Sequence, residues 1–167
     1  MSAAGVAAED LAAIAELLGR EPRGVVAVAH RCRCGRPDVV ETAPRLPDGT
    51  PFPTTFYLVD PHAAAVVSTL ESSGLMREMT QRLADDEDLA AAYTAAHEDY
   101  LRRRAALGAV PEIEGVSAGG MPTRVKCLHA LVGHALAVGP GVNPFGDEAL
   151  ELLRADPTGW PTTCPHR

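Results

Sequence analysis

The spacing of apolar residues near the start of the chain predicts a helix. Leu11, Ile14 and Leu18 recur at intervals of three and four residues within residues 7–18, which places them on one face of a helix. Gly19 follows directly, and glycine is the residue that most often ends a helix. We therefore expect an amphipathic helix over residues 7–18 that buries this apolar face.

Three short runs of β-branched and aromatic residues predict strands. They cover residues 24–30, residues 38–43 and residues 54–59, and the last run has the highest β propensity in the chain. The loop at residues 44–53 between the second and third runs contains four prolines and an Asp-Gly turn. Because the runs follow one another without crossover helices, we expect a mainly antiparallel sheet.

The second half of the chain predicts further helices. Asp60-Pro61 and Asn143-Pro144 each combine an N-cap residue with proline at the first helical position. The expected helices cover residues 60–73, 75–84, 85–107, 122–138 and the segment after residue 143, with a loop at residues 108–120. The fold class expected is α+β, with a small sheet of about three strands and several helices packed on it. We expect one domain over residues 1–167 with a loosely held tail at residues 156–167.

Composition and charge exclude several classes of protein. Apolar residues make up 46% of the chain, which is typical of a globular domain. The net charge of −7 argues against general binding to nucleic acids, which requires a concentrated basic surface. No run approaches the roughly 20 apolar residues that cross a bilayer, and no signal peptide is evident. We expect a cytoplasmic protein with no membrane partner, in which cysteines serve as thiols or metal ligands.

Candidate chemistry is concentrated in residues 124–134. Cys127, His129 and His134 lie within eight residues of one apolar, helix-like segment. On a regular helix, Cys127 and His134 would share one face, and His129 would join Cys127 only if the cysteine lay in an irregular first turn. A helix N-terminus and the adjacent basic residues favour a thiolate, the form that binds metals or attacks carbon. Alternatively, a cysteine on an apolar helix is simply a small buried side chain.

A second cluster, Cys32-Arg-Cys34, follows the first expected strand. Zinc prefers four tetrahedral nitrogen or sulfur ligands, and the two clusters together could supply them. The ligand set expected from the sequence is Cys32, Cys127 and His134, with His129 or Cys34 as the fourth. This set requires the loop that carries Cys32 and Cys34 to fold against the amino end of the histidine helix, the expected helix over residues 122–138. An iron–sulfur cluster is a weaker alternative, and Cys164 with His166 in the tail forms a third candidate group.

Basic residues flank both clusters. Arg31 precedes Cys32, and Arg124 and Lys126 precede the histidine helix. Arginine matches phosphate and carboxylate groups, so these residues could form a binding site for a small anion. The alternative is that they balance nearby acidic residues.

Several segments together resemble a known bacterial family. They are Arg31-Cys32 with Gly35 and Pro37, residues 44–53, Phe56-Tyr57-Leu58, residues 119–129 with His134, and residues 141–144. The chain resembles the bacterial domain-of-unknown-function family numbered five hundred and one. The resemblance implies a short cytoplasmic protein without an established reaction, encoded beside enolase, a septum-formation initiator and an exopolyphosphatase-type phosphatase. It also implies that other members carry cysteine where this chain has Asp60.

Three functions are compatible with these observations, and whether the protein is an enzyme stays open. The first is a zinc-binding domain with a nearby anion site. The second is a thiol enzyme in which Cys127 is the nucleophile and His129 or His134 the base, acting on an anionic substrate. A Cys/His/Asn arrangement with Asn143 is a variant of it, although helix capping already explains Asn143. The third is a non-catalytic interaction module linked to cell division, with an unidentified protein partner.

Overall fold

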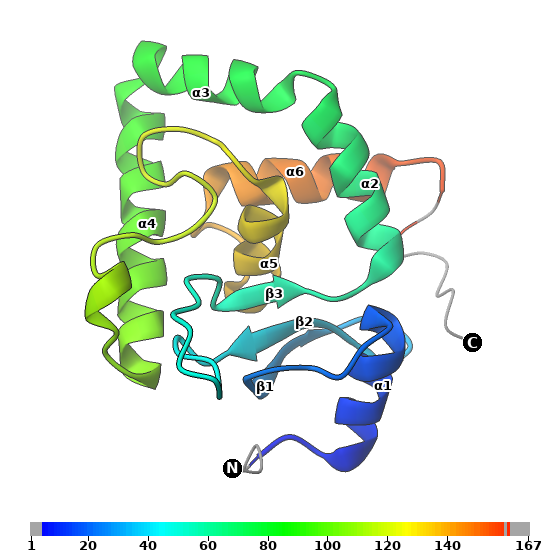
Figure 1. Ribbon diagram of the computed structural model, residues 1–167. Helices are drawn as coiled ribbons and strands as arrows, with labels where there is room; N and C mark the ends of the chain where they lie inside the picture. The colour runs from blue at the N-terminus through cyan, green and yellow to red at the C-terminus, as the bar shows by residue number, and fades with distance from the viewer. Residues whose placement is uncertain (1–4, 159, 161–167) are drawn as a thin grey trace.

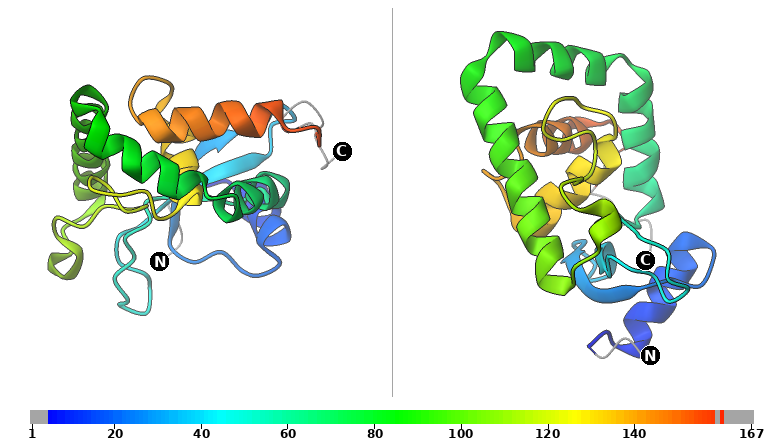
Figure 2. Two further views of the ribbon diagram at one scale, coloured as in Figure 1. Left: turned by 90° about the horizontal axis from the view of Figure 1, so that it is seen from above. Right: turned by 60° about the vertical axis from the view of Figure 1, so that its left-hand side comes forward.

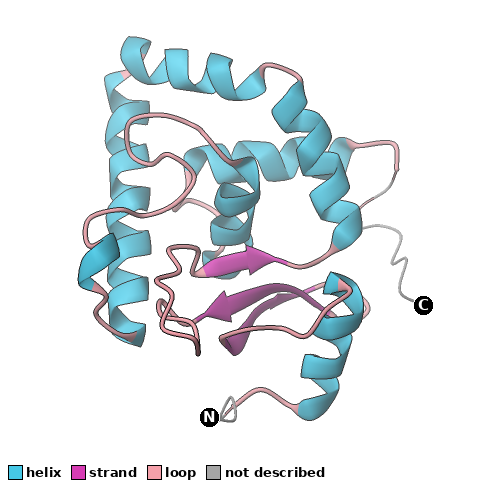
Figure 3. Cartoon of the chain, viewed as in Figure 1, coloured by secondary structure: helices cyan, strands magenta, loops and turns pink. Residues whose placement is uncertain are grey.

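The computed structural model describes residues 5–158 and residue 160, and it confirms an α+β fold (Figure 1 and Figure 3). The strands are β1 (Val25–Arg31), β2 (Pro37–Thr42) and β3 (Phe56–Leu58). The helices are α1 (Ala8–Leu18), α2 (Pro61–Ser72), α3 (Leu75–Asp85), α4 (Glu87–Leu107), the short 3-10 helix η1 (Pro111–Ile113), α5 (Leu128–Val138) and α6 (Pro144–Ala155). Among the described residues, no helix combines the length and apolar character needed to cross a bilayer.

The three strands form one antiparallel sheet in the order β1-β2-β3. Val40 of the central strand pairs with Val28 of β1 on one side and with Tyr57 of β3 on the other. Both connections are loops, as expected for strands that run in alternating directions. The predicted antiparallel sheet is therefore confirmed.

Helices cover both faces of this sheet. Val39 and Val40 are neighbours on β2, so their side chains point to opposite faces, yet both are almost completely buried. Val40 packs in a cluster with Ile14 of α1, whereas Val39 belongs to the larger cluster that contains Leu128 of α5. The sheet thus separates a small α1 layer from the main helical layer.

Helix α5 lies at the centre of the helical layer. In Figure 1 and in the right-hand view of Figure 2, α2, α3 and α4 form three sides of a frame around it. A side chain at Gly133 would place its Cβ 2.7 Å from the backbone oxygen of Phe56, so glycine allows α5 to pack directly on β3. This position makes α5 the element on which strands and helices converge.

The predicted helix caps are confirmed. The Asp60 carboxylate accepts hydrogen bonds from the backbone N–H groups of His62 and Ala63, and Asn143 caps α6 through the N–H of Gly146. Trp160, within the segment expected to be a loose tail, is buried and donates its indole N–H to Asp60. Residue 159 and residues 161–167 of that tail, including Cys164 and His166, lie outside the described residues.

The predicted start of the histidine helix is wrong. Helix α5 begins at Leu128 rather than near Pro122, and residues 119–127 form a compact loop. The carbonyl of Gly119 accepts the backbone N–H of Lys126 at 2.7 Å, which closes the loop on itself. Gly119 has a φ of 66° and no room for a side chain beside Leu131, so this turn favours glycine. Cys127 consequently lies outside the helix, at its N-cap position.

Candidate functional site

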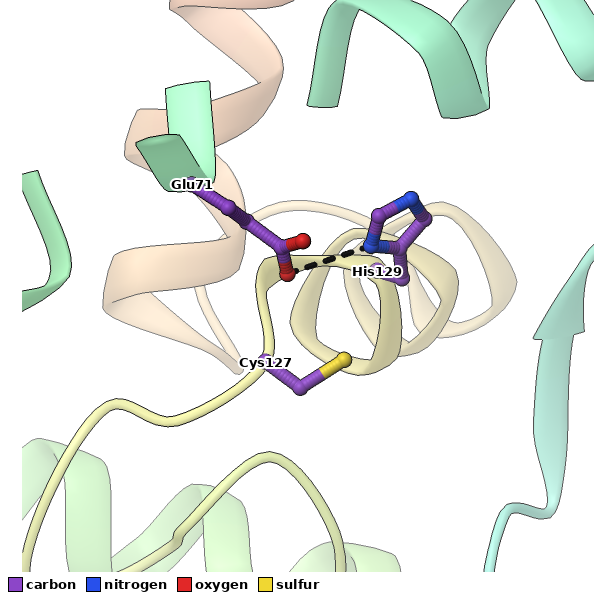
Figure 4. Close-up of side chains that lie close together, drawn as sticks. All are labelled: Glu71, Cys127 and His129. Atoms are coloured by element: carbon purple, nitrogen blue, oxygen red, sulfur yellow. Dashed lines mark ion pairs between the residues drawn. The ribbon is translucent and has the colours of Figure 1, made fainter. Parts of the chain in front are cut away.

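Three polar side chains converge at the N-terminus of α5. Glu71 comes from the last turn of α2, while Cys127 and His129 come from the start of α5 (Figure 4). The carboxylate, the thiol and one ring nitrogen lie within 4.8 Å of one another. Within the described part of the chain, this is the only group of three or more possible metal ligands of the Cys, His, Asp and Glu types.

The extended backbone of Cys127 brings the two α5 ligands together. Its φ of −148° and ψ of 109° are not helical, so the side chains of Cys127 and His129 do not point in the opposite directions that a regular helix would impose. The expectation that an irregular first turn would let these two side chains converge is confirmed. Cys127 and His129 are both partly buried, so the group is sheltered but reachable.

Glu71 also holds the first turn of α5 in place. Cys127 makes no side-chain cap to its own helix, and the Leu128 N–H donates instead to Glu71 Oε2 at 2.8 Å. The same oxygen lies 3.1 Å from Nδ1 of His129. One carboxylate oxygen from α2 therefore both caps α5 and faces the histidine ring.

The contacts of the His129 ring fix the role of each nitrogen. Nε2 lies 3.2 Å from the backbone oxygen of Ala64 and 3.4 Å from Oγ of Ser68. Because a carbonyl only accepts, Nε2 carries the hydrogen. In the neutral ring, Nδ1 would then point a lone pair at the Glu71 carboxylate. A proton or a metal ion between these two atoms removes that repulsion.

The surroundings favour positive charge at this point. The Cys127 side chain and then the Glu71 carboxylate raise the pKa of His129 to about 9, although burial acts in the opposite direction. An ordinary histidine is mostly neutral at neutral pH. Without a metal, His129 therefore holds a proton at neutral pH in the position that a cation would otherwise take.

His134 lies elsewhere, in the protein core. Its ring is fully buried, Nε2 donates to Asp99 Oδ2 at 2.9 Å, and Nδ1 accepts from Nδ2 of Asn143 at 3.1 Å. The ring also stacks on Phe56, with centroids 5.8 Å apart. Both nitrogens thus have protein partners, and the structure does not bring His134 into the group formed by Glu71, Cys127 and His129.

The environment of His134 favours its neutral form. Burial lowers its pKa, against the opposing effect of Asp99. Burial of Asp99 raises the pKa of that carboxyl, but hydrogen bonds from Arg103 and His134 outweigh it, and the net shift is downward. Asp99 also pairs with Arg102, so its charge is neutralised from the surface side. These contacts form a buried hydrogen-bond network that joins α4, α5 and the start of α6.

Cys32 and Cys34 lie in the tight turn between β1 and β2. The Cys32 N–H donates to the Arg36 carbonyl at 2.9 Å, and the two sulfurs are 2.8 Å apart. Ion pairs of Arg31 with Asp10 and of Arg36 with Glu16 join the ends of this turn to α1. Neither cysteine is part of the group at the start of α5. Of the five ligands expected from the sequence, the structure brings together Cys127 and His129.

The three residues of the expected anion site, Arg31, Arg124 and Lys126, also differ in their surroundings. Arg31 is engaged by both carboxylate oxygens of Asp10, at 2.8 and 2.7 Å. Arg124 and Lys126 remain exposed beside Cys127, and neither is in an ion pair with any described residue. Of the three residues expected to bind an anion, Arg124 and Lys126 therefore keep charges that no described carboxylate neutralises.

Sequence reasoning missed Glu71. It lies 56 positions before Cys127, in a different helix. One signal was present: an acidic residue in the last turn of a helix is opposed by the helix dipole, and here α2 carries no basic residue in that turn. The groups that stabilise the Glu71 carboxylate come from another helix, α5: they are the Leu128 N–H and His129.

Comparison with known proteins gives a family but no activity. The family described as "Protein of unknown function (DUF501)" matches residues 28–151, which include β2, β3, the greater part of β1 and the candidate site. No curated protein matches the chain, and no solved structure matches it.

Proposed function

We propose that this chain, which belongs to the family of unknown function numbered 501, binds a zinc ion through Glu71, Cys127 and His129. The observation that carries the proposal is the ring of His129, whose Nδ1 faces a carboxylate while its Nε2 bonds to a backbone carbonyl. The proposal keeps Cys127 and His129 from the set expected from the sequence and adds Glu71.

The ligand types and their supports match those of zinc sites. Zinc binds thiolate sulfur, imidazole nitrogen and carboxylate oxygen at about 2.0–2.3 Å, so its ligands lie roughly 3.5 Å apart. The three atoms are already within 4.8 Å, and small side-chain rotations would close the difference. Metal-bound histidines usually donate their other N–H to a carbonyl or carboxylate, as His129 does to Ala64.

Three protein ligands, the number that the described residues supply, leave one tetrahedral position for water. That arrangement is typical of catalytic zinc sites, where the metal makes its bound water acidic enough to act at neutral pH. A structural zinc site would instead have four protein ligands. The geometry therefore favours a reactive site over a purely structural one.

The thiol-enzyme alternative uses the same residues but fits the ring less well. In a nucleophile–histidine–carboxylate arrangement, the nucleophile and the carboxylate bond to opposite ring nitrogens. Here Glu71 takes Nδ1, and the opposite nitrogen faces the Ala64 carbonyl rather than a thiol. Cys127 could still react as a free thiol in the metal-free protein, and alkylation would reveal it.

The test is metal content with matched variants. We expect purified protein loaded with zinc to retain about one ion per chain, and Cys127→Ser, His129→Ala and Glu71→Gln each to weaken zinc binding by at least about tenfold. Cobalt-substituted protein should show a sulfur-to-metal charge-transfer band that disappears in Cys127→Ser.

The controls change the same residue types outside the site. Cys32→Ser, His62→Ala and Glu78→Gln should leave the zinc stoichiometry at Cys127 and the cobalt band unchanged. If the protein binds no zinc while circular dichroism shows it folded, the metal proposal is wrong. If Cys32→Ser abolishes the cobalt band and Cys127→Ser does not, the ion is bound by the other cysteine cluster.

A further inference from the structure

A cavity adjoins the candidate zinc site. It has a volume of about 410 Å³, and Cys127 forms part of its wall together with Arg124, Lys126, Thr123, Ser117 and Thr54. No acidic residue contributes to its lining within the described chain, although the protein as a whole carries a net charge of −7. The cavity is therefore a locally basic region on an acidic protein.

The two cations of this cavity are carried by a well-anchored backbone. The Tyr93 hydroxyl of α4 donates to the Arg124 carbonyl at 2.9 Å, and the Val125 N–H donates to Oγ1 of Thr80 on α3 at 2.9 Å. The Lys126 N–H bonds to the Gly119 carbonyl. The chain thus holds Arg124 and Lys126 at fixed positions while their side chains remain exposed.

The charges on Arg124 and Lys126 are not neutralised locally. Neither has a carboxylate partner among the described residues, whereas Arg31, Arg36 and Arg82 each form an ion pair. Two such cations on one cavity wall attract anions, and an arginine fork binds phosphate or carboxylate oxygens in pairs. The hydroxyls of Thr123 and Thr54 on the same lining can donate further hydrogen bonds.

We infer that this cavity binds a small molecule through a phosphate or carboxylate group, held by Arg124 and Lys126, with the rest of the molecule directed toward Cys127. The inference rests on the proposed zinc site, because Cys127 belongs both to the cavity wall and to the metal group. It assigns the substrate class of that site: a small anion whose reactive part reaches the metal.

The experiment measures anion binding and zinc content separately in the full chain. Inorganic phosphate and succinate are titrated into zinc-loaded and metal-free protein at low ionic strength, and binding is followed by calorimetry and by NMR shifts of the residue 119–127 amides. We expect at least one of the two anions to bind, and the double variant Arg124→Gln/Lys126→Gln to weaken it at least tenfold while retaining zinc. The anion that binds more tightly identifies the group recognised.

A matched double variant controls for overall charge. Arg33→Gln/Arg154→Gln removes two exposed cations away from the cavity and should change anion affinity by less than twofold. Equal weakening by both double variants, or no binding of either anion to zinc-loaded protein, overturns the inference. If the protein takes up no zinc but still binds an anion through Arg124 and Lys126, the anion site stands and the metal proposal is wrong, so the two failures are distinguishable.

Discussion

His129 and His134 lie five residues apart on one helix, yet their surroundings give them opposite properties. His129 is partly exposed beside Cys127 and Glu71, and its pKa is raised to about 9. His134 is fully buried, and burial lowers its pKa. The surroundings of His129 favour a positive charge, either a proton or a metal ion, whereas His134 is a neutral residue of the core.

The difference shows that a histidine-rich segment is not in itself a metal site. Each ring contacts a carboxylate. His134 donates a hydrogen bond to Asp99 through Nε2. His129 instead faces Glu71 with Nδ1, the nitrogen that carries no hydrogen in the neutral ring. The partner of the other ring nitrogen determines which nitrogen carries the hydrogen. Asn143 donates to Nδ1 of His134, whereas the Ala64 carbonyl accepts from Nε2 of His129. Backbone and amide contacts therefore separate a structural histidine from a candidate ligand.

The largest effect expected is on stability. We predict that His134→Ala lowers the free energy of unfolding by about 3 kcal/mol or more, because it opens a cavity beside Phe56 and removes one buried hydrogen bond from Asp99 and one from Asn143. His129→Ala in metal-free protein should cost less than His134→Ala, because the His129 ring is only partly buried. Urea denaturation measures both, and equal losses would contradict the distinction between the two histidines.

The next effect concerns zinc affinity and pH. Zinc requires His129 in its deprotonated form, and this ring keeps its proton up to about pH 9 in the metal-free protein. Competition titrations should therefore show the zinc affinity rising by up to about tenfold per pH unit between roughly pH 7 and pH 9 for this proton alone. An affinity that is constant over this range would exclude His129 as a ligand.

A smaller effect isolates the capping role of Glu71. In metal-free protein, Glu71→Ala should destabilise the fold by about 1 kcal/mol, because the Leu128 N–H at the start of α5 loses its acceptor. Glu71→Gln retains an oxygen acceptor and should cost less, although it removes a zinc ligand. Thermal unfolding without zinc measures the cap, and zinc titration measures the ligand. A Glu71→Gln protein that binds zinc normally would leave Glu71 with the capping role alone.

A further effect is the pH dependence of stability without metal. Because the pKa of His129 is higher in the folded than in the unfolded chain, the folded state binds more protons between these two values. The contribution of His129 is therefore complete below about pH 6.5 and is lost as the pH rises through about 9. The difference in stability between wild type and His129→Gln should shrink over this range. A difference that grew with pH would show that the assigned shift has the wrong sign.

Much of the fold could be predicted from local patterns. The apolar spacing around Ile14, the valine-rich strands and the caps at Asp60 and Asn143 each depend on residues close in sequence, and the structure confirms them. The predicted start of α5 failed because Pro122 can begin a helix or lie in a loop with equal local plausibility. Residues 119–127 form a loop because of the turn at Gly119 and because residues 124–126 contact α3 and α4. The contacts with α3 and α4 join residues that are far apart in the sequence.

The candidate site was only half predictable, for the same reason. Cys127 and His129 are two positions apart, so their proximity follows from the chain itself once the first turn is irregular. Glu71 reaches them only because α2 packs against α5. His134 could not be told from His129 by residue type or spacing, since burial and the partners Asp99 and Asn143 arise from other elements.

The sequence by itself determined which segments become helices and strands, where most of them begin, and that reactive side chains gather near residue 127. Only the tertiary structure decided which of these side chains meet, because a cluster of ligands depends on packing between α2 and α5 that no local pattern encodes. The protonation of each histidine is likewise a property of its packed surroundings, since charge is stabilised or disfavoured by the groups around it.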